Sequence, residues 1–187
     1  VRLTMQLIAT ETGKFFDRKV TADGEPRAEV AMTGLTTLWL NTGTLCNLAC
    51  ENCYIESIPS NDRLIYLSRD DVLRYLEEIS QAALPVREIG ITGGEPFMNP
   101  DILGILEDCL SRGFKMLVLT NAMRPMMKRA DGLLALAQGY PDQLTLRVSI
   151  DHFERALHEQ ERGRRSWQPT IDGLRWLSER GFDLHVA

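Results

Sequence analysis

Short apolar runs alternate with amphipathic segments along most of this chain. From residue 36 onward, the runs have the length of buried strands, and the segments between them carry apolar residues at helical spacing. This alternation predicts an α/β fold, with repeated β-α units around a parallel sheet. The strands are predicted near residues 36–40, 88–92, 115–119, 144–150 and 183–187.

The helices are predicted from apolar spacing and from signals at their ends. Between the first two strands, Val72, Leu76 and Ile79 fall on one helical face, and Ser68 with Asp71 has the spacing of a capping box. Further helices are expected from Asn99-Pro100-Asp101 to Gly113, around 125–138 with an end at Gly139, and around 169–180 from Pro169 to Gly181.

The first 34 residues have a different pattern. Asp23-Gly24, between the runs 15–21 and 27–32, predicts a short β-hairpin. We therefore divide the chain into an N-terminal extension, residues 1–34, and a core, residues 35–187. The core stops inside the fifth predicted strand, whose outer apolar face would lack a covering helix. This ending favours a truncated core.

Composition limits the classes of function. The 187 residues suit one main domain, and no stretch approaches the ~20 apolar residues of a membrane span. Residues 1–10 lack the features of a secretory signal, so we expect a cytoplasmic protein with reduced cysteines. A net charge of −5 makes nucleic acid an unlikely partner.

Two local clusters of basic residues occur in this chain although its net charge is negative. Solvated surface charge is the favoured interpretation of both, and contact with RNA is the alternative. The clusters are Arg124/Lys128/Arg129 and Arg162/Arg164/Arg165.

Three cysteines within eight residues, Cys46, Cys50 and Cys53, carry the strongest chemical signal. Three thiolates can hold a [4Fe–4S] cluster and leave one iron open, whereas structural zinc wants a fourth protein ligand, for which a distant histidine would have to reach the loop. The spacing would also suit one helical face, but Asn41-Thr42-Gly43 indicates a loop. Cys109 lies on the apolar face of a predicted helix and is assigned to packing.

The cysteine spacing and three later motifs together resemble the radical S-adenosylmethionine (radical SAM) superfamily over roughly residues 36–187. The defining loop of that family is Cys-x3-Cys-x2-Cys. The later motifs are Gly93-Gly94-Glu95-Pro96, Thr120-Asn121 and Val148-Ser149-Ile150-Asp151. The resemblance implies a partial, TIM-like (β/α) barrel of six β-α units, of which about five are present here.

The resemblance also implies two cofactors, a [4Fe–4S] cluster and S-adenosylmethionine. It assigns Cys46, Cys50 and Cys53 to the cluster. For S-adenosylmethionine it suggests the methionine amino group at Gly93, Gly94 and Glu95, the ribose at Ser149 and Asp151, and further contacts from Asn121 and Arg162. A turn or helix cap is an equal alternative for Asn121, and a solvated arginine is one for Arg162.

The order of the motifs agrees with the predicted fold. Each follows a different predicted strand, and the carboxyl ends of parallel strands meet at one rim of a barrel. Along the fourth strand, Thr145, Arg147, Ser149 and Asp151 alternate with apolar residues, so we expect the polar set, with Thr92 and His185, to face the lumen. Arg147 would bind a substrate anion or, more simply, pair with Glu88 or Asp183.

Three positions depart from the family pattern. Asn52 stands where many members carry an aromatic residue near adenine, a contact that Tyr54 could supply instead. His152 stands where glycine is common. Residues 158–163 resemble the His-Asp-x-x-Arg-Gly of peptide-modifying members, but Glu159 replaces the aspartate.

The sequence therefore predicts a radical SAM enzyme that cleaves S-adenosylmethionine reductively and abstracts hydrogen from a peptide or small-molecule substrate. An electron donor such as flavodoxin or ferredoxin is the implied partner, and no residue is assigned to the substrate reaction itself. The alternative is a non-catalytic iron–sulfur electron-transfer or zinc-binding module.

Overall fold

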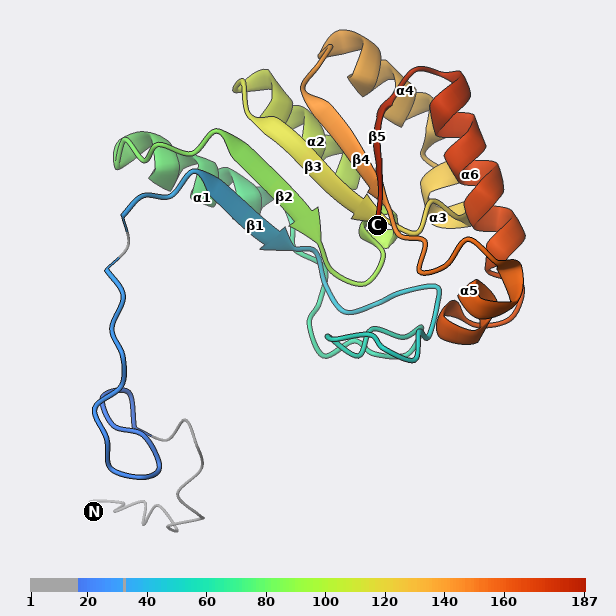
Figure 1. The fold of residues 1–187 in the computed structure, drawn as a ribbon. Coiled ribbons are helices and arrows are strands. Elements are labelled where there is room, and N and C mark those ends of the chain that lie inside the picture. Colours follow the sequence, from blue (N-terminus) through green and yellow to red (C-terminus); the bar gives the residue numbers. More distant parts are fainter. Residues whose placement is uncertain (1–16, 32) are drawn as a thin grey trace, which may run out of the picture. The chain divides into compact units, whose positions relative to one another are not determined.

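A computed structural model describes residues 17–31 and 33–187 (Figure 1). The chain divides into two compact units, Val1–Thr33 and Gly34–Ala187. In the first, Val20 and Pro26 form an antiparallel bridge around the turn, and the Arg27 N–H donates to the Lys19 carbonyl at 2.8 Å. Over residues 17–31 the predicted strands go no further than this bridge, because mostly exposed residues offer no packed face. Residues 15, 16 and 32 of the predicted hairpin lie outside the described part.

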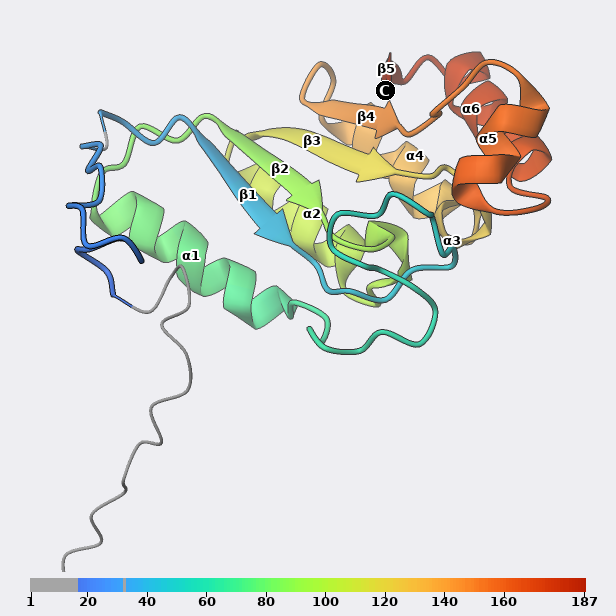
Figure 2. The ribbon, with the colours of Figure 1, turned by 60° about the horizontal axis from the view of Figure 1, so that its bottom comes forward.

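The second unit is built on a five-stranded, all-parallel sheet in the order β1-β2-β3-β4-β5. The open sheet and its covering helices form a partial (β/α) barrel, which confirms the predicted fold class (Figures 1 and 2). The fourth strand ends two residues earlier than predicted. The strands are β1 (Thr37–Asn41), β2 (Glu88–Thr92), β3 (Lys115–Thr120), β4 (Leu144–Val148) and β5 (Asp183–Val186).

Helices connect the strands and cover one face of the sheet. The elements are α1 (Arg69–Gln81), the 3-10 turn η1 (Pro96–Met98), α2 (Ile102–Ser111), α3 (Arg124–Met127), α4 (Ala130–Gly139), α5 (Arg155–Arg162) and α6 (Trp167–Glu179). The capping box of α1 is present, since the Asp71 N–H donates to the Ser68 hydroxyl at 3.2 Å and the Ser68 N–H donates to the Asp71 carboxylate.

Several helix boundaries differ from the prediction. The segment 125–138 is split into α3 and α4 at Arg129, whose backbone leaves the helical region. The Asn99 side chain accepts from the Asp101 N–H at 2.9 Å, so it closes a turn and α2 begins later than predicted. Helix α6 begins at Trp167, because Pro169 is tolerated within a first turn, where N–H groups lack helical partners. Helix α5 was not predicted.

The alternation along β4 orients the sheet. Leu144, Leu146 and Val148 are buried in the core between sheet and helices, whereas Thr145 is half-buried and Arg147 is exposed. The predicted orientation of this strand is therefore confirmed. Cys109 is fully buried in the same core, as predicted, and burial raises the pKa of its thiol to about 12.

The ion pair predicted for Arg147 is not formed. Strand register places Asp183 opposite Thr145, whose hydroxyl donates to the Asp183 carboxylate, and places His185 opposite Arg147. Glu88 lies on β2, where the Thr37 hydroxyl donates to it at 3.4 Å. Within the described residues, no carboxylate lies within 4.0 Å of the Arg147 guanidinium, so this cation stays free on the lumen side.

Candidate functional site

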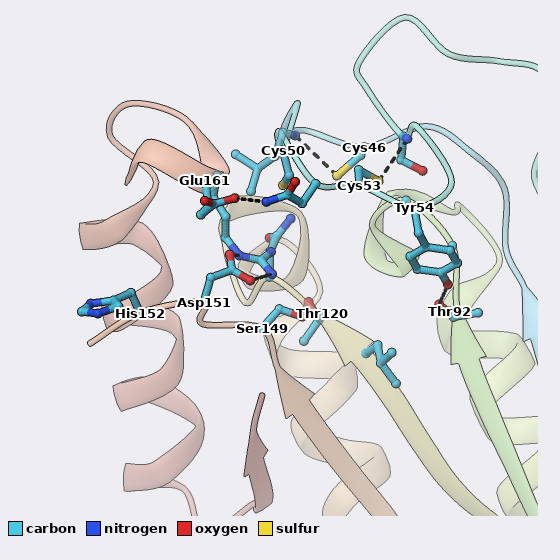
Figure 3. Close-up of a pocket in the computed structure, with 18 of the residues that line it drawn as sticks. Cys46, Cys50, Cys53, Tyr54, Thr92, Thr120, Ser149, Asp151, His152 and Glu161 are labelled. Atoms are coloured by element: carbon cyan, nitrogen blue, oxygen red, sulfur yellow. Dashed lines mark hydrogen bonds and ion pairs between the residues drawn. The ribbon is translucent and has the colours of Figure 1, made fainter. Parts of the chain in front are cut away.

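The carboxyl ends of the strands surround a cavity of about 540 Å³ (Figure 3). The loop after β1 contributes the three cysteines, and the ends of β2, β3 and β4 contribute the later motifs, because parallel strands present these ends at one rim. Of the predicted site residues, all but Glu95 line this cavity. They are Cys46, Cys50, Cys53, Gly93, Gly94, Asn121, Ser149, Asp151 and Arg162.

The three thiols differ in exposure and in hydrogen bonding. Cys46 is buried and its sulfur accepts from the Leu48 N–H at 3.4 Å, while the half-buried Cys53 accepts from the Ser57 N–H at 3.2 Å. Burial raises the pKa of Cys46 to about 11 and also raises that of Cys50. Both thiols are therefore protonated at neutral pH until a metal centre displaces their protons.

The donor set suits a cluster that uses one thiolate per iron. In the described part of the chain, no three Cys, His, Asp or Glu side chains converge as they would around a single metal ion. Ligands on separate irons need not converge on one point. Three thiols around a cavity of this size therefore fit a [4Fe–4S] cluster with one iron left open to a further ligand.

Gly93 and Gly94 begin the loop after β2, which we call the β2 loop. They bring it against the loop after β1 that carries Cys46, Cys50 and Cys53, which we call the cysteine loop. A Cβ on Gly94 would lie 2.1 Å from the Leu45 carbonyl oxygen, and Gly93 has a φ of +136° that side chains rarely adopt. The Gly94 N–H donates to the Gly43 carbonyl at 2.9 Å. We expected glycine at these positions so that a ligand could approach the backbone. The structure shows a second reason for glycine here, which is the close approach of the two loops.

The Glu95 side chain does not line the cavity. It is 2% exposed, and its carboxylate accepts from the Thr120 hydroxyl at 2.8 Å, the Asn121 N–H at 2.9 Å and the Phe97 N–H at 3.2 Å. It therefore ties the β2 loop to the end of β3. Burial raises the pKa of Glu95 to about 7, against the opposing effect of these donors.

Asn121 joins β3 to the cysteine loop. Its side-chain amide donates to the Asn47 side-chain oxygen at 2.9 Å, and its own side-chain oxygen accepts from the Met123 N–H at 3.0 Å. The second contact is the turn-capping role considered as an alternative, and the residue also lines the cavity. Both roles are therefore compatible with its position.

Arg162 lines the cavity and forms an ion pair with Asp151, which is labelled in Figure 3. Its Nη2 donates to the Asp151 Oδ1 at 3.1 Å, and its side chain is 16% exposed, so it is not a solvated surface arginine. The guanidinium lowers the pKa of Cys50, although burial outweighs this effect. A paired cation and carboxylate are thus held beside the thiols.

Helix α5 also holds the cysteine loop directly. The Glu51 N–H donates to the Glu161 carbonyl at 2.8 Å, and the Asn52 side-chain amide donates to the Glu161 carboxylate at 2.5 Å. Glu161 was not among the residues predicted for the site. The sequence feature that could have pointed to Glu161 is Asn52, a polar residue at a position where an aromatic one is usual, because such a side chain needs a hydrogen-bond partner. His158 of the same helix is fully buried against Trp167, and burial lowers the pKa of its imidazole.

Two further cavity-lining residues have side chains available to a ligand. The Ser149 hydroxyl makes no hydrogen bond within the part of the chain that the structure describes, while its N–H donates to the Thr120 carbonyl at 3.0 Å. Tyr54 is 81% exposed, and its hydroxyl lies 3.5 Å from that of Thr92 (Figure 3). An aromatic ring is therefore present at the cavity, from the position next to Cys53.

A partial parallel barrel with three thiols and polar strand ends around one cavity fits the class of iron–sulfur proteins with room for a small cofactor. Residues 40–187 match the family described as the Radical SAM superfamily, and the chain belongs to this superfamily of enzymes. Members of the family use a [4Fe–4S] cluster and S-adenosylmethionine, as the sequence motifs predicted.

Relatives within the superfamily have varied names. The chain is 30% identical over 143 residues to the antilisterial bacteriocin subtilosin biosynthesis protein AlbA of Bacillus subtilis, covering 76% of this chain and 30% of AlbA. It is 32% identical over 142 residues to a GTP 3′,8-cyclase of Rhodococcus opacus, covering 73% of this chain and 38% of the cyclase. The chain thus spans about a third of the length of these relatives.

The fold is also found in solved structures. Streptococcus suis SuiB bound to S-adenosylmethionine aligns with a TM-score of 0.65 at 20% identity, covering 82% of this chain and 33% of SuiB. Methylornithine synthase aligns with a TM-score of 0.60 at 13% identity, over 81% of this chain and 43% of the synthase. Over the described residues, no helix is both long and apolar enough to cross a membrane.

Proposed function

We propose that this chain is the catalytic core of a radical SAM enzyme that cleaves S-adenosylmethionine reductively and uses the resulting 5′-deoxyadenosyl radical to abstract hydrogen from a substrate. The observation that carries the proposal is the meeting of Cys46, Cys50 and Cys53 with the polar end of β4 in one cavity. A cluster held by these three thiolates would supply the electron and an open iron that the cofactor could chelate. The protein supplies position and exclusion of water.

The residues around the cavity have distinct proposed roles. Ser149 offers an unoccupied hydroxyl to a ribose, and the backbone at Gly93 and Gly94 offers polar groups to the methionine end. Asp151 and Arg162 form an ion pair at the cavity and can orient the cofactor's charged groups. Glu95 has a positioning role, because its carboxylate accepts from the Asn121 N–H and so holds the end of β3 in place at the cavity.

The favoured substrate is a peptide. AlbA, by its name, takes part in the biosynthesis of a bacteriocin, and SuiB has been solved bound to the precursor peptide SuiA. GTP 3′,8-cyclase instead acts on a small molecule, which stays the alternative. The unpaired Arg147 on the lumen side, opposite His185, is a candidate contact for a carboxylate of either kind of substrate.

A non-catalytic electron-transfer or zinc module is the competing function. An electron-transfer or zinc module binds no small molecule beside its metal centre, so its function does not require a cavity lined by polar groups there. The free hydroxyl of Ser149 and the Asp151–Arg162 pair stand at that cavity. The geometry therefore favours cofactor chemistry.

The test is anaerobic reconstitution of the chain with iron and sulfide, followed by reduction with dithionite in the presence of S-adenosylmethionine. We expect about four irons per chain and formation of 5′-deoxyadenosine without any added substrate. A cluster that forms fully, together with no 5′-deoxyadenosine, would support the electron-transfer module. One tightly bound zinc in place of iron would support the zinc module.

A further inference from the structure

A second cavity, of about 820 Å³, borders the cysteine loop at Asn47. We name it the basic groove. It is lined by Asn47 of the cysteine loop, by Phe97 and Met98 of η1, and by four residues of the 124–129 segment, Arg124, Pro125, Lys128 and Arg129. None of the roles assigned above uses this groove.

The charge of the basic groove is uncompensated. No acidic residue lines it, and within the described residues the side chains of Arg124, Lys128 and Arg129 make no ion pair or hydrogen bond. Some cations of the core are paired, as Arg69 is with Asp108, whereas these three are not. Three free cations at one place are unexpected in a chain whose net charge is −5. A ligand of opposite charge would be attracted to this position.

The groove and the cofactor cavity share a wall only one loop thick. Asn47 lines the groove, while its neighbours Cys46 and Leu48 line the cofactor cavity. The Asn47 side chain is fixed in this wall, since it accepts from the Asn121 amide at 2.9 Å and contacts the Met123 sulfur at 3.6 Å. A molecule seated in the groove would therefore lie next to the cluster-binding loop.

We propose that the basic groove docks an acidic one-electron carrier protein of the flavodoxin or ferredoxin kind. The inference rests on the proposed function, which needs one electron for each cleavage of S-adenosylmethionine. The carrier loses that electron and the cluster on the cysteine loop gains it, and no bond or proton changes at the groove. Complementary charge gives such a contact its fast association, and a patch of three cations suits a transient partner.

An acidic protein suits the groove better than RNA does. Proteins that bind single-stranded nucleic acid combine cations with exposed aromatic rings on which bases stack. The aromatic residue of the groove, Phe97, is only 2% exposed and belongs to the core. The groove therefore offers charge without a stacking platform.

The experiment compares two triple variants of the cluster-loaded chain. Arg124→Gln/Lys128→Gln/Arg129→Gln removes the groove's charge. Arg87→Gln/Arg112→Gln/Lys115→Gln removes the same charge at the amino ends of β2 and β3, on the opposite rim. Binding of oxidised flavodoxin is measured by fluorescence anisotropy at about 50 mM and about 200 mM salt, between which screening strengthens markedly. Iron content and circular dichroism check that each variant is folded.

We expect the wild-type affinity to fall with salt, the groove variant to bind at least about tenfold more weakly at low salt, and the opposite-rim variant to change less than about twofold. Dithionite, which needs no docking, should reduce all three proteins equally. Equal losses in the two variants, or no loss in the groove variant, would overturn the inference. So would loss of single-stranded RNA binding in the groove variant with flavodoxin binding unchanged. Dithionite-driven 5′-deoxyadenosine formation tests the proposed function separately.

Discussion

Four cysteines with the same side chain occupy two different environments in this protein. Cys46, Cys50 and Cys53 face a cavity from a loop, whereas Cys109 is fully buried on α2 and packs among aliphatic side chains. Their chemistry follows from this placement, because a thiol must reach a metal centre to ligate it. The difference can be tested one residue at a time.

We expect alanine at Cys46, Cys50 or Cys53 to abolish cluster binding, since two thiolates cannot hold the cluster in place. Cys109→Ala should keep the full iron content and lower the free energy of unfolding by about 1 kcal/mol, the cost of a small core cavity. Iron analysis and urea unfolding measure the two effects. Loss of iron in Cys109→Ala as complete as in the loop variants would refute the three-ligand assignment.

Glu95 makes the stability of the protein without its cluster depend on pH. Its pKa is raised from 4.5 to about 7 in the folded chain, so folding favours the protonated form. Below pH 4.5 the carboxyl group is protonated in both the folded and the unfolded chain, so it does not lower the free energy of unfolding. As pH rises from 4.5 to about 7, the unfolded chain releases the proton first, and the free energy of unfolding should fall by up to about 3 kcal/mol.

The control is Glu95→Gln, which cannot ionise. This variant is less stable at low pH, because its amide nitrogen cannot accept the Asn121 N–H that the Glu95 oxygen accepts. Its stability should nevertheless lack the part of the decline between pH 4.5 and 7 that is due to Glu95. Parallel pH profiles for wild type and variant, measured by urea unfolding, would contradict a raised pKa.

At the scale of elements, the cysteine loop is held in place by several neighbours at once. The loop after β2 packs against it at Gly94, and the end of β3 bonds to it through Asn121 and Asn47. Helix α5 bonds to it through Glu161, which is labelled in Figure 3. A cluster-binding loop fixed from several sides is preorganised for its ligand. Disturbing one neighbour should therefore affect the cluster before it affects the fold.

Gly94→Ala tests this support. An added Cβ would lie 2.1 Å from the Leu45 carbonyl oxygen, so the cysteine loop must move, and we expect iron content to fall well below one cluster per chain. Gly139→Ala is the matched control, because a Cβ there meets open space at the end of α4 and should leave the iron content unchanged. Full iron content in Gly94→Ala would show that the loop tolerates the displacement.

At the scale of the whole molecule, a ligand that binds only the folded state stabilises all of it. With the cluster in place, S-adenosylmethionine at about 100 times its Kd should raise the free energy of unfolding by about 2.7 kcal/mol. Ser149→Ala removes a hydroxyl that no described protein group uses, so it should leave the ligand-free protein unchanged and weaken cofactor binding about fivefold. Thermal unfolding with increasing cofactor measures both effects.

The control for that measurement is Ser178→Ala, an exposed serine on α6 away from the cavity. Its stabilisation by cofactor should match that of the wild type. If Ser149→Ala also matched the wild type, the ribose contact would have to be assigned to another residue.

The sequence by itself determined the pattern of elements and the rim at which the motifs meet. Apolar spacing marks the strands and most helices, and parallel strands place their carboxyl ends together, so the loop of Cys46 and the ends of β2, β3 and β4 were predictable as one site. The burial of Cys109 followed from its helical face in the same way. These features depend on residues near one another in sequence.

Only the tertiary structure decided which side chains face the cavity and which hold it together. Glu95 is buried because Thr120 and Asn121 offer hydrogen-bond donors from the end of another strand. Arg147 stays unpaired because the strand register places Asp183 opposite Thr145, two residues away along β4. The bond from α5 to the cysteine loop and the basic groove beside that loop also join segments far apart in sequence. No local pattern encodes such contacts, since their geometry exists only once the barrel has formed.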